Sequence, residues 1–81
     1  MTLQHAESIF SMHNPEKLVI TLLYLKDEEG AEEEIREVSN PTLKQTSKGH
    51  HLLIGYDKLR EAVRSFRIDR VVEVLNVEEV L

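Results

Sequence analysis

The sequence predicts a mainly β domain of the α+β class, in which a short N-terminal helix precedes a bent sheet of five antiparallel strands. Three observations lead to this prediction. Apolar residues recur at helical spacing near the N-terminus, short stretches rich in β-branched and aromatic residues follow, and turn-forming residues separate those stretches. A chain of 81 residues has room for one domain, which we assign to residues 1–81.

The helix is predicted over residues 2–14. Apolar side chains recur there at helical spacing, Thr2 can cap the first turn, and Asn14-Pro15 can end the helix. The first strand is predicted over residues 18–26, an almost wholly apolar run of β-forming residues. This run is too short for a helix and suits a strand that is covered on both faces.

Four further strands are predicted where apolar residues alternate with polar ones between turn-forming residues. After a turn at residues 27–30, the second strand of the chain is expected to end before Asn40-Pro41. In the third, the alternation assigns Leu52 and Ile54 to the core face. The four predicted ranges are 33–39, 50–57, 63–71 and 72–77. The residues expected in the core are Leu18, Ile20, Leu22, Leu52, Ile54, Phe66, Ile68 and Val72.

Composition excludes several classes of protein. The chain contains no cysteine, which excludes a disulfide framework, a thiolate nucleophile and any zinc site that depends on sulfur. No apolar run reaches the length of a membrane span, and the first residues lack the basic and apolar stretches of a signal peptide. We therefore expect a cytoplasmic protein that has no membrane partner.

The net charge of −5 is distributed unevenly along the chain. Residues 1–43 carry three basic and nine acidic side chains, whereas residues 44–70 carry seven basic and three acidic ones. The basic part is the expected binding surface for an anionic partner. The glutamates between residues 28 and 37 are expected to form a solvated hairpin, because isolated carboxylates make poor cation sites.

Two stretches of the basic part carry a family resemblance. Residues 64–71 read Arg-Ser-Phe-Arg-Ile-Asp-Arg-Val, and residues 49–57 read Gly-His-His-Leu-Leu-Ile-Gly-Tyr-Asp. Together they resemble the C-terminal half of a WYL domain, in which a Trp-Tyr-Leu triplet precedes a block of the form Arg-x-Phe-Arg-Leu-Asp-Arg-Ile. Only the leucine of the triplet remains, since His51, Leu52 and Leu53 occupy its positions. Upstream, Tyr24, Asp27 and Gly30 resemble the family's first hairpin, and Arg36, Val38 and Pro41 resemble its Arg-x-Val-x-Pro with one extra residue.

This resemblance, which spans about residues 6 to 75, implies an Sm-like barrel with an N-terminal helix followed by five bent strands. Members of the family usually accompany a helix-turn-helix in bacterial transcription regulators, or occur in defence-associated and helicase proteins. They are thought to bind nucleic acid or nucleotide-like ligands. The sequence shows no helix-turn-helix, so the resemblance implies a stand-alone domain or a fragment that acts with such a regulator.

The expected ligand-binding residues are Arg64, Arg67 and Arg70. Arginine suits phosphate because its planar fork donates two parallel hydrogen bonds. Arg64 and Arg70 share a face of an extended strand about 20 Å apart, and a bent strand would bring them closer. The alternative is a structural role, in which Arg64 or Arg70 pairs with Asp57 or Asp69 and ties strands together.

His51 and Tyr56 complete the expected ligand-binding set. Tyr56 can stack on a base, although its alternation with the apolar residues of its strand also fits a core position. His51 can make a polar contact in a pocket. No metal site or cofactor is expected, because the adjacent His50 and His51 point to opposite strand faces and no carboxylate lies beside them at ligand spacing.

Two functions remain open from the sequence. The first is a regulatory module that binds nucleic acid or a phosphorylated nucleotide on the arginine-bearing strand. The second is a protein-interaction or oligomerisation module whose arginines are structural. An enzyme is not expected, because no phosphate-binding loop, nucleophile motif or metal-ligand spacing occurs. A homo-oligomer is expected, because a domain this small gains stability by burying more apolar surface.

Overall fold

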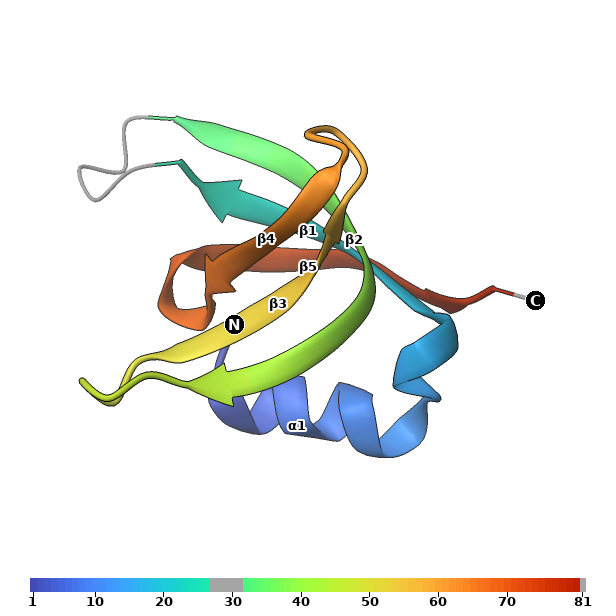
Figure 1. Cartoon of the computed structure of the whole chain (residues 1–81), viewed down its shortest axis with the longest axis horizontal. Helices are drawn as coiled ribbons and strands as arrows, with labels where there is room; N and C mark the ends of the chain where they lie inside the picture. The colour runs from blue at the N-terminus through green and yellow to red at the C-terminus, as the bar shows by residue number, and fades with distance from the viewer. Residues whose placement is uncertain (27–31, 81) are drawn as a thin grey trace.

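In the computed structural model, which describes residues 1–26 and 32–80, one α-helix precedes five strands of a single antiparallel sheet (Figure 1). The predicted fold class is confirmed. The elements are α1 (Leu3–Met12), η1 (Pro15–Lys17), β1 (Leu18–Leu25), β2 (Glu33–Gln45), β3 (His51–Asp57), β4 (Ala62–Arg67), η2 (Ile68–Arg70) and β5 (Val71–Glu79), where η denotes a 3₁₀-helix. Among the described residues, no helix has the length and apolar character needed to cross a lipid bilayer. The turn predicted at residues 27–30 lies outside the described residues.

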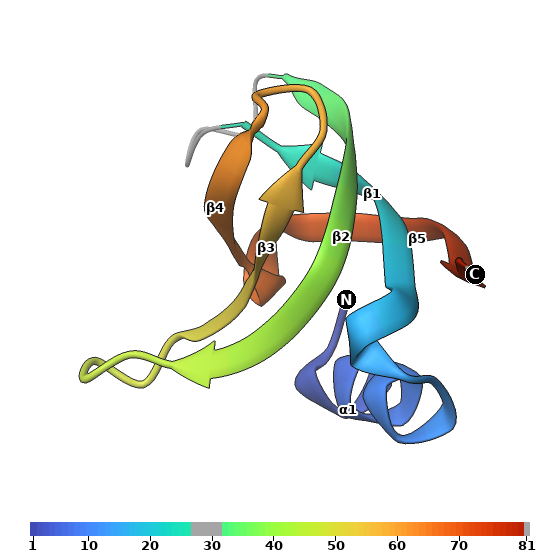
Figure 2. The ribbon, with the colours of Figure 1, turned by 45° about the vertical axis from the view of Figure 1, so that its right-hand side comes forward.

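The strands are ordered β4-β3-β2-β1-β5 and pair antiparallel with their neighbours. Figure 2 shows the resulting curvature, in which β2 follows a long arc from its hairpin with β1 to its hairpin with β3. Helix α1 lies across the concave side, where Ala6 and Ile9 are buried. The Thr2 hydroxyl caps the helix by accepting a hydrogen bond from the His5 amide at 3.1 Å, as predicted.

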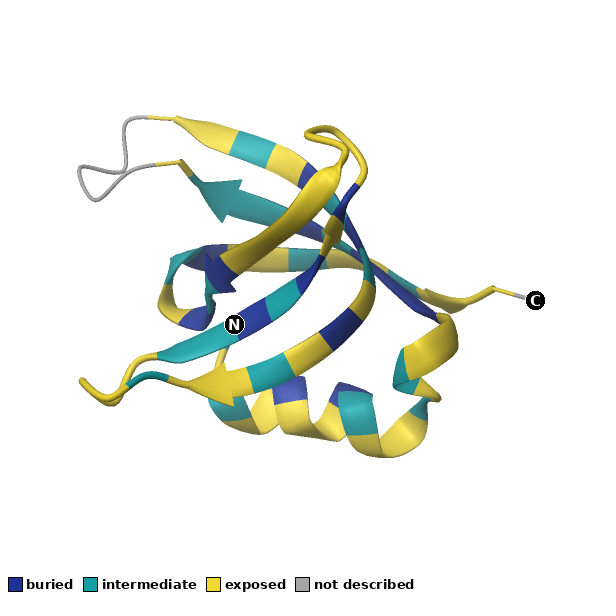
Figure 3. Cartoon of the chain, viewed as in Figure 1, coloured by how far each residue is buried: buried dark blue, intermediate teal, exposed yellow. Residues whose placement is uncertain are grey.

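The core is formed by the inward faces of the strands. Leu18, Ile20 and Leu22 alternate along β1 and are at most 1% exposed. They pack in one cluster with Ile9, Val38, Leu53, Phe66 and Val71. Figure 3 shows the buried positions as bands along the ribbon, with exposed positions between them.

The predicted inward face of β3 is wrong by one residue. The buried positions are Leu53, Gly55 and Asp57, whereas Leu52 and Ile54 are only partly buried. A glycine and an aspartate on the inward face conceal the periodicity, because neither reads as a core residue in the sequence. Tyr56, Leu52 and Ile54 therefore share the outer face. Val72, also predicted in the core, is 47% exposed because the chain turns just before it.

Strand β2 does not end before Asn40-Pro41 but continues to Gln45. Its pairing with β3 is irregular between Ser39 and Thr42, and Asn40 adopts a positive φ of 51° there. Asparagine tolerates this conformation, and proline is accepted where a strand is irregular and its amide is not needed. The extra residue between Val38 and Pro41 is accommodated at this point.

The strand predicted over residues 63–71 is also interrupted. After β4 the chain forms one 3₁₀ turn, in which the Val71 amide donates to the Ile68 carbonyl, and β5 begins at Val71. The Ile68 side chain is 4% exposed and anchors this turn in the core. The α-amine of Met1 donates a hydrogen bond to the Val71 carbonyl, which holds the start of the chain at the same place.

Gly55 is the position where β2 and β3 approach too closely for a side chain. A Cβ atom there would lie 2.6 Å from Val38 Cγ1 and 2.8 Å from the Ser39 carbonyl oxygen. We expect Gly55→Ala to lower the free energy of unfolding by about 1–3 kcal/mol, since the backbone of β2 would have to move. Urea unfolding measures this, with Thr42→Ala as an exposed control on β2 that should change stability by about 0.5 kcal/mol. An unchanged midpoint for Gly55→Ala would contradict the close packing.

Candidate anion-binding site

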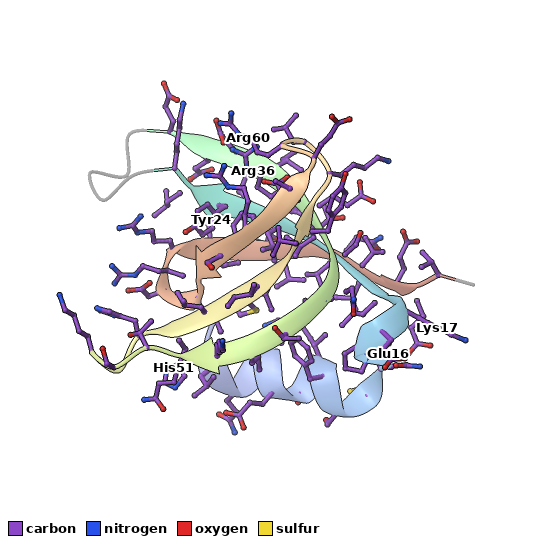
Figure 4. The ribbon with its side chains drawn as sticks, viewed as in Figure 1. Glu16, Lys17, Tyr24, Arg36, His51 and Arg60 are labelled. Carbon is purple, nitrogen blue, oxygen red and sulfur yellow. The ribbon has the colours of Figure 1, made fainter. Side chains whose placement is uncertain are left out.

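A cavity of about 340 Å³ opens where β1 ends and β2 begins, at the end of the sheet opposite the β2–β3 hairpin. We call it the arginine cavity, because four arginines from β2, β4 and the two adjoining turns line it. Its lining residues are Tyr24, Lys26, Glu34, Arg36, Arg60, Arg64, Ser65, Phe66 and Arg70. Figure 4 labels Tyr24, Arg36 and Arg60 in this part of the molecule.

The cavity lies where the residues on the inward face of the sheet change from apolar to polar. On β2 the inward positions run from apolar Val38 through Arg36 to Glu34, and on β1 they run from Leu22 to Tyr24. Side chains two residues apart on a strand share a face, so these polar groups continue the layer of the core. The apolar interior therefore ends in a charged layer.

Arg36 is the buried member of this layer. Its side chain is 7% exposed, its Nη2 donates to Glu34, and its Nε lies 3.7 Å from Oδ2 of the fully buried Asp57. The other Asp57 oxygen accepts a hydrogen bond from the Leu59 amide at 3.0 Å. Arg36 Nη1 is buried and has no hydrogen-bond partner among the described residues. A buried N–H group without an acceptor destabilises the protein, so an acceptor that reaches this nitrogen would bind favourably.

The remaining cations surround Arg36. Arg60 lies on the turn after β3, Arg64 is exposed on β4, and Arg70 is half-buried in η2. Lys26 directly follows β1, and its Nζ lies 3.7 Å from Glu34 Oε1. Among the described residues, five basic side chains and one acidic side chain line the cavity, and their formal charges sum to +4 in a chain whose net charge is −5. Charges of one sign around a hollow attract small ions of the opposite sign.

One wall of the cavity is aromatic. The rings of Tyr24 and Phe66 pack edge to face, with centroids 5.1 Å apart and planes at 89°. The Tyr24 hydroxyl accepts a hydrogen bond from the Arg67 amide at 3.1 Å, which ties β1 to β4. Both ends of the tyrosine are thereby engaged, so it forms a fixed wall.

Of the three predicted arginines, Arg64 and Arg70 both line the arginine cavity, because the turn in η2 folds the chain back between them. Arg67 does not line it. Arg67 donates to both carboxylate oxygens of Asp69, at 3.0 and 2.6 Å, and its Nη2 lies 3.3 Å from His50 Nδ1. The hydrogen bonds from Arg67 hold the pKa of Asp69 below its ordinary value, against a smaller opposing effect of burial.

Both carboxylates of the structural alternative form ion pairs, but with Arg36 and Arg67, whereas Arg64 or Arg70 was the expected partner. Asp57 pairs with Arg36, and Asp69 pairs with Arg67. The pair that holds Asp57 is buried, whereas Asp69 is 60% exposed at its side chain. An exposed pair of this kind contributes little to stability.

His51 and Tyr56 lie away from the arginine cavity. His51, labelled in Figure 4, lies near the β2–β3 hairpin. It lines a separate hollow of about 260 Å³ together with His50 and Asp69. Tyr56 is 43% exposed on the outer face of β3, so its interpretation as a core residue is wrong. The structure does not bring either residue together with Arg64 and Arg70.

Sequence reasoning missed Arg36, Arg60 and Lys26 as lining residues. A signal existed for Arg36, because it lies two residues from Val38 on a strand whose inward face was already apolar. The sequence held no such signal for Arg60. It lies in a turn, and whether a turn residue lines the cavity depends on how β3 and β4 pack relative to β1 and β2.

The family model described as the WYL domain matches residues 15–75. The chain belongs to the WYL domain family. Neither the curated proteins nor the solved structures that were searched contain a significant match. All residues that line the arginine cavity of this WYL domain fall within the matched range.

The Arg36–Asp57 pair predicts a clear stability signature. Arg36→Met leaves a buried carboxylate without its partner and should lower the free energy of unfolding by about 3–5 kcal/mol. Adding Asp57→Asn removes that charge and keeps an oxygen for the Leu59 amide, so the double variant should recover part of the loss. Urea unfolding of both single variants and the double variant measures the coupling. Additive losses would show that the two groups do not interact.

Proposed function

We propose that this WYL domain is a regulatory module that binds nucleic acid or a phosphorylated nucleotide in the arginine cavity. The family supports a regulatory ligand-binding domain. The observation that carries the finer proposal is the convergence of Lys26 and four arginines on one cavity, with the buried Arg36 among them. Arginine forks donate parallel hydrogen bonds to phosphate, and they are strongest where water is excluded.

The distribution of charge also favours an anion at this place. The chain as a whole carries a net charge of −5, so its average field repels nucleic acid. The arginine cavity is a local exception, because its described lining residues carry a formal charge of +4. A ligand of this kind would be held at one site instead of spreading over the surface.

The engagement of the other polar groups supports binding in preference to catalysis. Glu34 is held by Arg36 and Lys26, and the Tyr24 hydroxyl accepts from the Arg67 amide. A general base must be able to reach a proton on the substrate, and these groups are committed to the protein. We therefore propose a binding module and not an enzyme.

A protein-interaction or oligomerisation module is the second candidate. The observation that favours it is the exposure of Ile35 and Leu59, at 61% and 66%, beside a groove that they line with Thr21, Glu37 and Lys58. Such a module has no need of a buried arginine facing a cavity, so this candidate ranks below the first. The two roles are compatible, because the groove and the arginine cavity share no lining residue.

Arg64 and Arg67 form a matched pair for testing the proposal, since they lie on the same strand and only Arg64 lines the cavity. Arg64→Ala should weaken binding of a short fluorescent oligo(dT) about tenfold, the effect of losing a charged hydrogen bond. It should also reduce the slope of log affinity against log salt by about 0.7 for each phosphate that the variant no longer neutralises. Fluorescence anisotropy at several salt concentrations measures both quantities.

Arg67→Ala is the control and should leave affinity and salt slope nearly unchanged. Thermal melts of both variants verify that each one is folded. Equal losses in the two variants would place the ligand outside the arginine cavity. Unchanged binding by Arg64→Ala, together with lowered stability, would favour the interaction module.

A further inference from the structure

We propose that the arginine cavity receives a terminal phosphate, which is the phosphomonoester group of a free nucleotide or of an oligonucleotide end, and that Arg36 binds it. This inference rests on the proposed function and narrows the ligand to one chemical group. It follows from the partners of Arg36, from the size of the cavity and from the placement of the aromatic side chains.

Two of the three Arg36 side-chain nitrogens have acidic neighbours within the protein. Nη2 donates to Glu34, and Nε faces Asp57 at 3.7 Å. Nη1 is the nitrogen without a partner among the described residues, although the residue lines the cavity. The acids therefore orient the guanidinium and leave one nitrogen, with its two N–H groups, for an oxygen from outside.

Nη1 is covered, so a ligand reaches it only by displacing neighbouring side chains. Arg60 and Arg64 are exposed and line the same cavity, and exposed side chains change rotamer within nanoseconds. An anion that draws these two arginines around itself can enter between them. The group that reaches Arg36 must then be at the tip of the ligand.

The middle of a nucleic acid strand fits this geometry poorly. An internal phosphodiester carries one negative charge, two non-bridging oxygens and a sugar on each side, so both flanking nucleotides would have to follow it inward. The cavity measures about 340 Å³, near the lower limit of roughly 300 Å³ for small-molecule sites. A phosphomonoester has three outer oxygens, about −1.5 to −2 charges at neutral pH and one attachment. Its higher charge also suits a cavity whose described lining residues are mostly basic.

The features that hold a continuous strand are absent from the described surface around the cavity. Sites that follow a strand stack successive bases on aromatic side chains along a basic groove. The chain has two tyrosines, of which Tyr24 packs against Phe66 in the cavity wall and Tyr56 lies on the outer face of β3. Arg67, the next arginine along β4, is engaged with Asp69.

The test compares ligands that differ only in their ends. Isothermal titration calorimetry is done with a short oligo(dT) bearing a 5′-phosphate, one bearing a 3′-phosphate, one bearing neither, a closed circle of the same length, and thymidine monophosphate. We expect one phosphorylated end to bind about tenfold more tightly than the circle, because it adds a charge-assisted hydrogen bond from Arg36. Binding of the monophosphate at similar affinity identifies a free nucleotide as sufficient. Binding of the oligonucleotide end alone identifies a chain end.

Arg36→Lys is the matched variant, because it keeps a positive charge beside Asp57 and removes Nη1. It should abolish the preference, so that the 5′-phosphorylated strand binds no more tightly than the circle, while Arg67→Ala keeps the preference. Equal affinity of wild-type protein for all linear and circular oligonucleotides would overturn the inference and leave the proposed function standing. Failure of every ligand to bind would overturn both. If Arg36→Lys does not fold, the wild-type comparison alone decides.

Discussion

The buried pair of Arg36 and Asp57 sits where the apolar interior of the sheet ends. Asp57 is fully buried, and the Arg36 side chain is 7% exposed. Removing two charges from water is expensive. An ion pair at 3.7 Å compensates this only in part when Arg36 Nη1 and Asp57 Oδ2 have no hydrogen-bond partner among the described residues. A hydrophobic pair of similar volume would serve stability at least as well. The retained charges therefore point to a role that apolar side chains cannot fill.

The other parts of the site depend on this pair. Asp57 faces Arg36 with one oxygen and holds the Leu59 amide with the other, which fixes the turn that carries Arg60. Gly55 lies two residues before Asp57 on β3, where β2 and β3 approach too closely for a side chain. Arg64 arrives from β4 because Phe66, two residues later, is held in the core. This buried contact thus joins β2 to β3 and, through the Leu59 amide, to the turn that carries Arg60.

The element order and much of the core could be predicted from periodicity. Strand β1 is almost wholly apolar, and Phe66 and Ile68 are large apolar residues at alternating positions. The predicted core was wrong where the inward face of a strand carries residues that are not apolar. On β3 the buried residues are Leu53, Gly55 and Asp57. They can be recognised as the inward face only once the pairing of β3 with β2 is known. The convergence of Arg64 and Arg70 required the turn at residues 68–70, and a run of strand-forming residues conceals such a turn. Arg36 and Arg60 line the same cavity because of how the strands pair, and a single sequence does not specify that pairing.

Nuclear magnetic resonance of the arginine Nε–Hε groups can locate a bound anion directly. In a titration with 5′-phosphorylated oligo(dT), we expect the signals of Arg36, Arg60 and Arg64 to shift together and to saturate at one dissociation constant, while the signal of Arg67 shifts little. A shift of the Arg67 signal, with the Arg36 signal unchanged, would contradict binding in the arginine cavity.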